Sequence, residues 1–262
     1  MVRGIRSKQG VYDEKKDADL HKLDILDSKN QAMDKIFEKG TSKRIWEELY
    51  KVIDSSDVLL NILDARNPNG TRSHQLEEYL RKSCPNKHLV YVINKCDLVP
   101  QSIVQKWIRI LSKTNPTLAF QASVGNPFGK GTLIQLLKQF DTLHRDKKSI
   151  SVGFIGYPNV GKSSVINTLK RKAVCKVAPI PGETKVWQYI ALTKRIYLID
   201  SPGHVQGTNE TETDKVLLGI VRPEKIPEPD HFIAAILNKA GKKSIQNVYG
   251  LIDWKDDEDF ID

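Results

Sequence analysis

The chain has 262 residues, 39% of them hydrophobic and 28% charged, so it is long enough for one large domain with additions and a sizeable core. Its three cysteines, without zinc spacing, argue against a disulfide framework and suit a reducing compartment. No apolar run approaches the roughly 18 residues of a membrane span, and no apolar stretch follows the basic first ten residues. The sequence therefore predicts no membrane anchor and no secretory signal.

The chain is basic, with a formal net charge of +9. Because the last ten residues carry six acidic residues and one lysine, the 252 residues before them carry +14. Such an excess favours nucleic acid or another anionic partner. A soluble basic protein without such a partner fits the charge equally well.

Residues 1–36 are rich in Lys, Asp and Ser and have weak hydrophobic periodicity. We interpret them as an arm that either orders on a partner or stays a solvated tail. Buried-strand and amphipathic-helix patterns then alternate as far as residue 204. This alternation predicts an α/β domain over residues 37–204, with a mostly parallel sheet, helices on both faces and ligands at the carboxyl ends of the strands.

Three helix starts are predicted from local patterns. Gly40-Thr-Ser42 precedes apolar residues at helical spacing. Two further pairs, Ser102 with Gln105 and Thr132 with Gln135, have the spacing of capping boxes.

Residues 156–164, GYPNVGKSS, match the phosphate-loop pattern G-x-x-x-x-G-K-[ST] between a strand pattern and a helix pattern. The glycines let backbone N–H groups curl round a phosphate, and the helix start adds a partial positive charge. A plain glycine turn is the alternative interpretation. We expect Lys162 to reach the β- and γ-phosphates and the Ser163 hydroxyl to bind Mg²⁺. The predicted nucleotide-binding residues here are Asn159, Val160, Gly161, Lys162, Ser163 and Ser164.

Residues 94–97, NKCD, close the apolar strand pattern of residues 89–93 and resemble the N-K-x-D element that reads guanine in P-loop GTPases. The carboxylate of Asp97 can accept hydrogen bonds from both guanine N1–H and the exocyclic amine, whereas adenine lacks that donor pair. An ATP-using enzyme is therefore disfavoured. Residues 121–123 are similar to the loop whose backbone N–H touches guanine O6. The predicted guanine-binding residues are Asn94, Lys95, Asp97, Ala122 and Ser123.

A D-x-x-G element, Asp200 to Gly203, follows the strand pattern of residues 196–199. It would place the Asp200 carboxylate behind Mg²⁺, acting through water, and the Gly203 N–H on the γ-phosphate. Thr184, in the PGET stretch that begins at Pro181, is expected to close over the same Mg²⁺. Lys162, Thr184 and Gly203 are thus the predicted catalytic residues, with His204 as a further possibility.

These elements come in an unusual order: guanine reader, base loop, phosphate loop, PGET and D-x-x-G. In an ordinary GTPase the guanine elements come last, so the order resembles that of the circularly permuted P-loop GTPases. Four stretches also resemble the nucleolar GTP-binding protein 2 family, assembly factors of the large ribosomal subunit in eukaryotes. They are DARNP at 64–68, NPFGKG at 126–131, GYPNVGKSS at 156–164 and GETKVWQ at 182–188.

The resemblance, which runs from about residue 37 to residue 203, implies a circularly permuted GTPase domain that binds GTP or GDP with Mg²⁺. It implies slow intrinsic hydrolysis that a partner stimulates, and action on pre-60S ribosomal particles through rRNA and ribosomal or assembly proteins. It places the protein in the nucleus and nucleolus, and we expect a monomer. Family members continue into a fuller helical domain, so this chain is either a compact member or part of a longer protein.

Residues 205–262 contain apolar residues at helical spacing, interrupted by Pro223, Pro227 and Pro229. We predict a small helical C-terminal segment. Because it follows the D-x-x-G element directly, it is placed to respond to nucleotide state.

Two residues have alternative interpretations. Asn159 stands where potassium-activated GTPases have an asparagine whose carbonyl oxygen helps to hold K⁺ against the phosphates; otherwise it is a plain loop residue. His204 stands where the family usually has an aliphatic residue, and DSPGH resembles the DCPGH of translational elongation factors, whose histidine helps the attacking water. Otherwise it is a solvated histidine. We expect its side chain to point outward in the free protein and inward when a partner orders the segment.

Two functions therefore stay open. The first is a GTPase that hydrolyses GTP to leave or remodel a pre-60S particle. The second is a GTP-dependent binding module on pre-ribosomal RNA with negligible turnover of its own. The identity of residue 204 is the feature of the sequence that separates them.

Overall fold

The structure is a computed structural model that describes residues 43–262 except for 124, 179–181, 185, 206–210, 222, 223, 225, 227, 251–253, 255–259, 261 and 262. The predicted arm of residues 1–36, and the predicted start of the domain at residue 37, lie outside the described residues. Pro181, Pro223 and Pro227 lie outside them as well.

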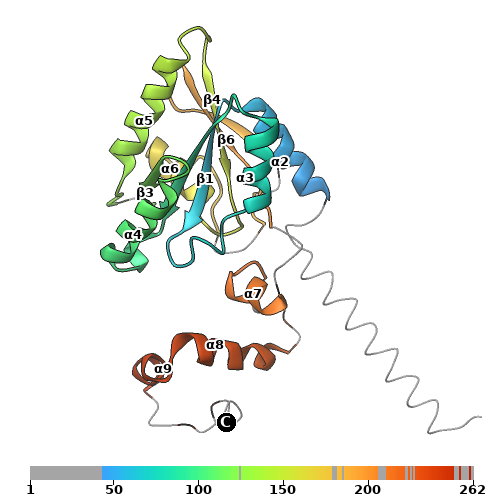
Figure 1. Cartoon of the computed structure of the whole chain (residues 1–262), viewed down its shortest axis with the longest axis vertical. Coiled ribbons are helices and arrows are strands. Elements are labelled where there is room, and N and C mark those ends of the chain that lie inside the picture. The colour runs from blue at the N-terminus through green and yellow to red at the C-terminus, as the bar shows by residue number, and fades with distance from the viewer. Residues whose placement is uncertain are drawn as a thin grey trace, which may run out of the picture.

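A six-stranded sheet forms the centre of the molecule, with strand order β3-β2-β1-β4-β6-β5 (Figure 1). All neighbouring strands are parallel except β5 and β6, which are antiparallel. The strands are β1 (Val58–Asp64), β2 (His88–Asn94), β3 (Thr117–Ala119), β4 (Ile150–Ile155), β5 (Gln188–Ala191) and β6 (Ile196–Asp200). The prediction of a mostly parallel α/β sheet is confirmed.

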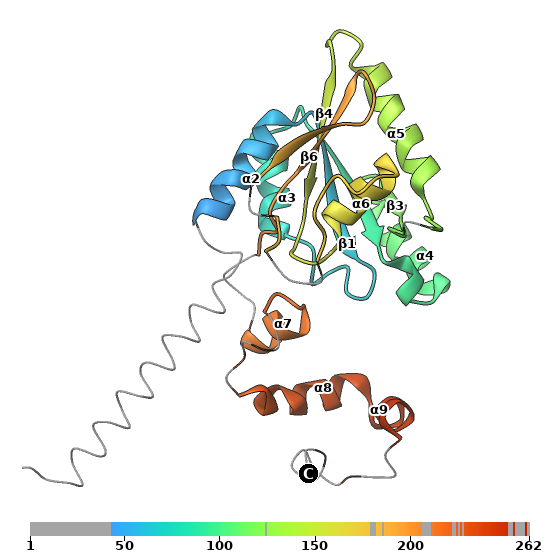
Figure 2. The ribbon, with the colours of Figure 1, turned by 180° about the vertical axis from the view of Figure 1, so that it is seen from behind.

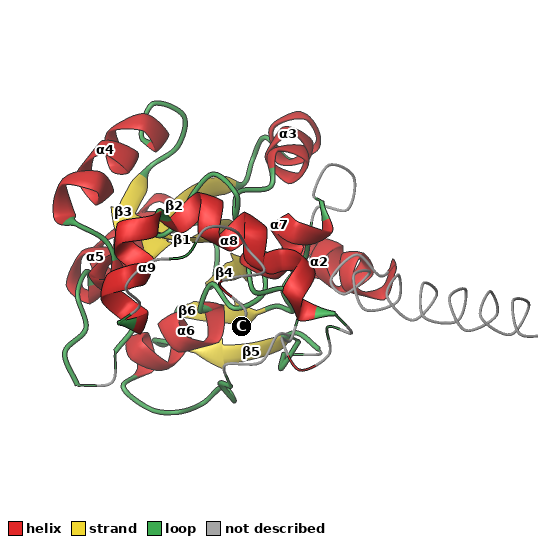
Figure 3. Ribbon diagram, turned by 90° about the horizontal axis from the view of Figure 1, so that it is seen from below, coloured by secondary structure: helices red, strands yellow, loops and turns green. Residues whose placement is uncertain are grey.

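Helices cover both faces of this sheet. α5 and α6 pack on one face, and α2, α3 and α4 pack on the other (Figure 3). Their bounds are α2 (Lys43–Ser55), α3 (His74–Ser83), α4 (Gln101–Leu111), α5 (Lys130–Leu143) and α6 (Lys162–Lys170). A short 3₁₀ helix, η1 (Cys96–Leu98), follows β2.

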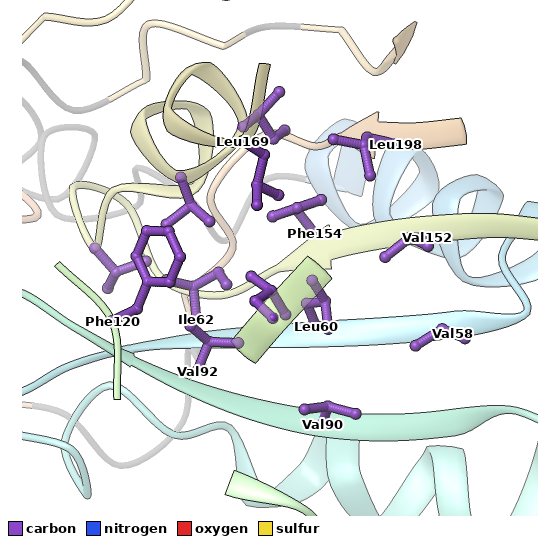
Figure 4. Close-up of a cluster of buried hydrophobic side chains, with 14 of the residues drawn as sticks. Val58, Leu60, Ile62, Val90, Val92, Phe120, Val152, Phe154, Leu169 and Leu198 are labelled. Atoms are coloured by element: carbon purple, nitrogen blue, oxygen red, sulfur yellow. The ribbon is translucent and has the colours of Figure 1, made fainter. Parts of the chain in front are cut away.

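The main core lies between the sheet and the pair α5 and α6. Alternate residues of β1, including Leu60 and Ile62, point into it beside Phe154 of β4 and Leu169 of α6 (Figure 4). Leu59, which lies on the opposite face of the strand, packs instead against α2 and α3. Because both faces are covered, every residue of β1 is buried, and the strand has a continuous apolar sequence rather than an alternating one.

The C-terminal segment is helical, as predicted. It contains α7 (Glu212–Leu217), the 3₁₀ helix η3 (Pro229–Phe232), α8 (Ile233–Ala240) and α9 (Lys242–Tyr249). Figures 1 and 2 show α7 at the carboxyl ends of the strands and α8 and α9 farther from the sheet. Val205 and Ile220 are buried in the main core of the domain. None of the helices described is long and apolar enough to cross a membrane.

The two predicted capping boxes are wrong. α4 begins at Gln101 directly after Pro100, so Ser102 lies inside its first turn. α5 begins at Lys130 with Gly129 as its N-cap, so Thr132 is also inside the helix. A backbone feature outside the Ser/Thr-x-x-Gln pattern precedes each helix: a proline with fixed φ before α4 and a glycine at φ +80° before α5.

Candidate nucleotide-binding site

A cavity of about 730 Å³ lies at the carboxyl ends of the central strands, where a doubly covered parallel sheet is expected to bind ligands. Its walls come from the phosphate loop, the ends of β1 and β2, residues 176–178 and 182–184, and the end of α7. All six residues predicted in the phosphate loop line it.

The phosphate loop leads from β4 into the first turn of α6, as predicted. Gly161 caps α6 at φ +96°, and a Cβ atom there would clash with Nδ2 of Asn94, so both conformation and space require glycine. Nζ of Lys162 donates to the carbonyls of Gly156 at 3.0 Å and Tyr157 at 2.7 Å. Burial lowers the pKa of Lys162 to about 8. A phosphate beside this ammonium would favour its charged form.

The predicted guanine elements are tied to the phosphate loop. Nδ2 of Asn94 donates to the carbonyl of Val160 at 2.8 Å, and its Oδ1 accepts from the N–H of Ala122 at 3.1 Å. Nζ of Lys95 donates to the carbonyl of Asn159 at 2.6 Å. The three elements that sequence analysis assigned to one nucleotide are therefore held together by their own side chains.

Asp64, at the end of β1, anchors Lys95. Its Oδ2 accepts from Nζ of Lys95 at 2.9 Å, and Arg66 donates to both of its carboxylate oxygens. Burial alone would raise the pKa of Asp64, but the hydrogen bonds from Arg66 and Lys95 lower it to about 2. The carboxylate is thus charged over the physiological range and orients the lysine of the guanine-reading element.

Two predicted guanine-binding residues lie apart from the cavity lining. Asp97 is in η1 with an exposed side chain, and Ser123 accepts a hydrogen bond from the N–H of Asn126 at 3.3 Å. Neither belongs to the described residues that line the cavity, whereas Ala122 does. The contact of Asp97 and Ser123 with guanine stays a prediction.

The three predicted Mg²⁺ ligands converge. Oγ of Ser163 donates to Oδ2 of Asp200 at 2.7 Å and lies 3.1 Å from Oγ1 of Thr184. Asp200 is fully buried, and its Oδ1 has no hydrogen-bond partner among the described residues. Burial raises the pKa of Asp200. Hard oxygen ligands suit Mg²⁺, and a cation would compensate the buried unpaired oxygen, so these residues fit the metal.

Gly203 lies against the phosphate loop. A Cβ atom at this position would come within 2.6 Å of Cα of Pro158, so the close approach requires glycine. The next residue, His204, donates its backbone N–H to the carbonyl of Gly156 at 3.3 Å. These contacts place the D-x-x-G element directly beside the loop that is predicted to hold the phosphates.

The expectation that His204 points outward is wrong. Its side chain is 0% exposed, with ring centroids 5.7 Å from Trp46 of α2 and 6.2 Å from Tyr157. Neither ring nitrogen has a hydrogen-bond partner among the described residues, and burial lowers the pKa of His204 to about 3. Because Gly203 packs on the phosphate loop and Val205 is buried in the core, the backbone turns the ring inward, into an apolar site.

Asn159 faces the C-terminal segment. Its Nδ2 donates to the carbonyl of Gly219, two residues after the end of α7, at 2.9 Å. Its φ is +59°, in the left-handed region that asparagine tolerates better than most residues. Both Asn159 and Gly219 line the cavity. The predicted role of Asn159 in holding K⁺ stays a prediction.

Sequence comparison relates this site to known proteins. Residues 151–249 match the family described as 50S ribosome-binding GTPase. Nucleolar GTP-binding protein 2 of Candida glabrata is 59% identical over 228 residues, which cover 87% of this chain and 46% of that protein. The protein of the same name in Saccharomyces cerevisiae is 58% identical over 232 residues, covering 88% of this chain and 48% of that protein. The chain spans about half the length of these relatives.

Structural comparison supports the same fold. GNP-bound YlqF from T. maritima superposes with a TM-score of 0.52 at 19% identity, covering 80% of this chain and 78% of that one. The chain shares the fold of that protein, and its sequence resembles the nucleolar GTP-binding protein 2 family. The names of the relatives bear out the expected nuclear and nucleolar location; rice and Arabidopsis relatives are named nuclear/nucleolar GTPase 2.

Sequence analysis missed three residues of this site. Asp64 was noticed only as part of a family motif, although its place after a buried strand next to the guanine-reading strand could have indicated the site. Cys175 is buried beside Asp200; burial first, and then the Asp200 carboxylate, raise the pKa of this thiol to about 12, which keeps it protonated. Gly219 carries no sequence signal for contact with the phosphate loop.

Proposed function

We propose that this GTPase domain binds GTP with Mg²⁺ and hydrolyses it to GDP and phosphate, and that it acts on precursors of the large ribosomal subunit. One observation carries the enzymatic part: Oγ of Ser163 lies beside Oγ1 of Thr184 and bonds to the buried carboxylate of Asp200, while Lys162, Ser163 and Thr184 line one cavity. Phosphoryl transfer needs positioned charge more than covalent help, and this arrangement supplies positioned charge.

Each residue has a defined task in this proposal. Lys162 gives its charge to the β- and γ-phosphates, and the N–H groups of the phosphate loop surround them. Ser163 and Thr184 would hold Mg²⁺ directly, and Asp200 would hold it through water. The bound Mg²⁺ would neutralise part of the phosphate charge. Gly203 offers its N–H to the γ-phosphate, and the packing of Asn94 and Lys95 fixes the guanine end relative to the phosphate end.

The ribosomal part of the proposal rests on the relatives. Their names describe nucleolar GTP-binding proteins, and the matching family is described as ribosome-binding. A net charge of +9 is compatible with an rRNA partner. We propose that the domain acts as a monomer on pre-60S particles, contacting rRNA and ribosomal or assembly proteins, and that residues 205–262 transmit its nucleotide state.

The burial of His204 favours a second candidate function, a GTP-dependent binding module with negligible turnover of its own. A ring enclosed by Trp46 and Tyr157 does not orient water for attack, so intrinsic hydrolysis should be slow. If a particle draws His204 out of this site, the His204→Ala variant should lose about 10²-fold of the stimulated rate, the usual scale for a positioned acid–base group. Equal stimulated rates in variant and parent would favour the binding module.

Nucleotide measurements test the proposal. GTP should bind far more tightly than ATP, and Asp97→Ala should weaken GTP binding by a few kcal/mol because guanine donors lose their acceptor. Single-turnover hydrolysis, with and without purified pre-60S particles, should be measurable in the parent and absent in Lys162→Ala. Equal affinity for GTP and ATP would refute the guanine assignment, and hydrolysis by the Lys162 variant at the parental rate would refute the catalytic one.

A further inference from the structure

An aromatic groove lies between α2 and α3, on the face of the sheet opposite α5 and α6 (Figures 1 and 2). It is a hollow of about 230 Å³ lined by Trp46 and Tyr50 of α2 and by Gln75, Leu76 and Tyr79 of α3. None of the described residues lines both this groove and the nucleotide cavity. The groove is therefore a separate surface from the predicted site.

The rings of the groove come from both helices. The ring centroid of Tyr50 lies 6.2 Å from that of Trp46 and 5.3 Å from that of Tyr79, whose ring is nearly perpendicular to it at 71°. Leu49, next to Tyr50, is fully buried in the core between the helices and the sheet, whereas the side chain of Tyr50 is 39% exposed. A side chain that enters the hollow would thus meet aromatic rings from two sides on a rigid base.

The rim of the groove carries negative charge. Glu47 and Asp54 are exposed residues of α2, three positions before and four positions after Tyr50, so helical spacing makes both its neighbours on the helix surface. Burial first, then Cys84, and then the carboxylate of Asp54 raise the pKa of Tyr79. Neither Glu47 nor Asp54 forms an ion pair with the side chains that the structure describes.

The lysines near this rim have partners of their own. Lys51 pairs with Glu48 and Lys82 with Glu78. Nζ of Lys87 donates to three backbone carbonyls at the end of α2, at 2.6, 2.8 and 2.9 Å. Although the chain has a net charge of +9, the charges left over beside the groove are those of two carboxylates.

Aromatic rings beside carboxylates suit one kind of side chain best. A guanidinium group is planar, positively charged and weakly hydrated, so it stacks on aromatic rings and pairs with carboxylates. Single-stranded RNA also stacks on aromatic rings, but the grooves that bind it are positively charged, and carboxylates would repel its phosphates. We infer that the aromatic groove is a docking site for an arginine side chain on an extended segment of a partner protein.

Trp46 joins this docking site to the interior of the protein. Its ring belongs to the groove and also lies 5.7 Å from the buried ring of His204, the residue directly after the D-x-x-G element. A partner on the groove therefore contacts a side chain that packs on His204. The partner surface and the D-x-x-G element share one aromatic ring.

A titration followed by nuclear magnetic resonance tests the inference on the whole chain. The signal is the indole N–H of Trp46, one of four tryptophans, which is identified by its loss in Trp46→Phe. The probe is a capped Gly-Ser-Arg-Ser-Gly peptide, and the control peptide carries citrulline, which keeps the shape of arginine without its charge. The arginine peptide should shift the Trp46 signal saturably and bind about fivefold more tightly than the citrulline peptide.

Variants separate the contribution of the rings from that of the charges. Tyr50→Leu keeps an apolar side chain but removes a ring, so it should weaken binding of the arginine peptide about fivefold. Its control is Tyr189→Leu, because Tyr189 is a 50% exposed ring on β5, and binding should be unchanged. Glu47→Gln combined with Asp54→Asn should weaken binding of the arginine peptide about threefold, the scale of exposed charge pairs, and leave the citrulline peptide unaffected.

Four results would overturn the inference. They are equal affinity for the two peptides, equal weakening by the variants of Tyr50 and Tyr189, a saturable shift of Trp46 with oligouridine but not with the arginine peptide, and a shift of Trp46 with protein concentration alone. The third would assign the groove to RNA, and the fourth, with a dimer in sedimentation, to a second copy of the chain. Because the peptides are titrated without nucleotide, the test holds whether or not the proposed function does.

Discussion

His204 is a base that the fold keeps neutral. Its ring is completely buried between Trp46 and Tyr157, with neither nitrogen paired among the described residues. A buried polar group without a partner costs about 1–3 kcal/mol. The histidine therefore occupies its buried site at a cost in stability.

This burial predicts a pH dependence of stability. The pKa of His204 falls to about 3 in the folded protein, from an ordinary value near 6.5, so below pH 6.5 the unfolded chain binds the extra proton and the folded one does not. Stability is therefore lost as pH falls from 6.5 towards 3. Between pH 7 and pH 5 the loss should be about 2 kcal/mol, and His204→Val should remove it.

Denaturant unfolding at pH 7 and pH 5 checks this prediction. The matched control is His231→Val, since the side chain of His231 is 74% exposed. The parent and the His231 variant should lose the same free energy of unfolding on acidification, and the His204 variant should lose less. If all three proteins lost the same free energy of unfolding between pH 7 and pH 5, His204 would become protonated while the protein stays folded, which would contradict the prediction.

Asp64 provides a second prediction at the scale of single residues. Asp64→Asn removes the charge that holds Lys95, and a hydrogen bond to a charged group contributes about 1.5–3 kcal/mol, so the affinity for GTP should fall about tenfold. Glu77→Gln is the control, because it weakens a comparable pair, Glu77 with Arg72, outside the cavity lining. Calorimetric titration with GTP should give a higher Kd for the Asp64 variant and the parental Kd for the Glu77 variant.

At the scale of elements, periodicity predicted the sheet and the existence of its helices, because apolar spacing records which face is buried. Helix starts were predicted less well. The residues that set them, Pro100 and Gly129, act through backbone conformation, while the capping-box pattern considers only side chains. Gly129 is required by its φ of +80° and by the carbonyl of Ala119, which an added Cβ would strike. That carbonyl lies on β3, so its closeness is not visible in the local sequence.

The two glycines at the start of α5 give a matched pair of variants. Gly129→Ala should destabilise the protein by about 2 kcal/mol or more, because alanine is strained at this φ and clashes with β3. Gly131→Ala should stabilise it by about 0.5–1 kcal/mol, since Gly131 lies inside the helix with open space around it. Thermal melts should show shifts of opposite sign. A stable Gly129 variant would mean that α5 can begin elsewhere.

The site was predictable where a short motif carries it and unpredictable where distant segments meet. The phosphate loop follows β4, Asn94 and Asp200 are the last residues of β2 and β6, and strand order alone brings them together. The pairing of Asn159 with Gly219 joins residues 60 positions apart through one backbone carbonyl, which no residue type reveals. The inward turn of His204 likewise depends on packing from α2, at the other end of the described chain.

At the scale of the whole molecule, charge and the C-terminal segment concern different partners. A net charge of +9 acts on any polyanion, so affinity for naked rRNA fragments should fall steeply with salt and be insensitive to nucleotide. Residues 216–221 touch both the nucleotide cavity and the apolar cluster of Val221 and Phe232 before α8, so we expect them to carry the effect of nucleotide to a partner that holds the outer helices α8 and α9. Net charge therefore governs non-specific binding to RNA, and the C-terminal segment governs the binding that depends on nucleotide state.

We therefore expect GTP analogue and GDP to give the same affinity for naked rRNA but different affinities for assembled pre-60S particles. Sedimentation with particles at two salt concentrations separates the contribution of charge to the affinity from the contribution of nucleotide state. The affinity for particles should fall with salt, because salt weakens the contribution of charge, while the ratio of the affinities with GTP analogue and with GDP should be retained. Ile220→Ala should bring the two particle affinities together and leave RNA binding unchanged, since it removes the core anchor without altering charge. A nucleotide effect of equal size on naked RNA would place the switch in the RNA-binding surface instead of in the C-terminal segment.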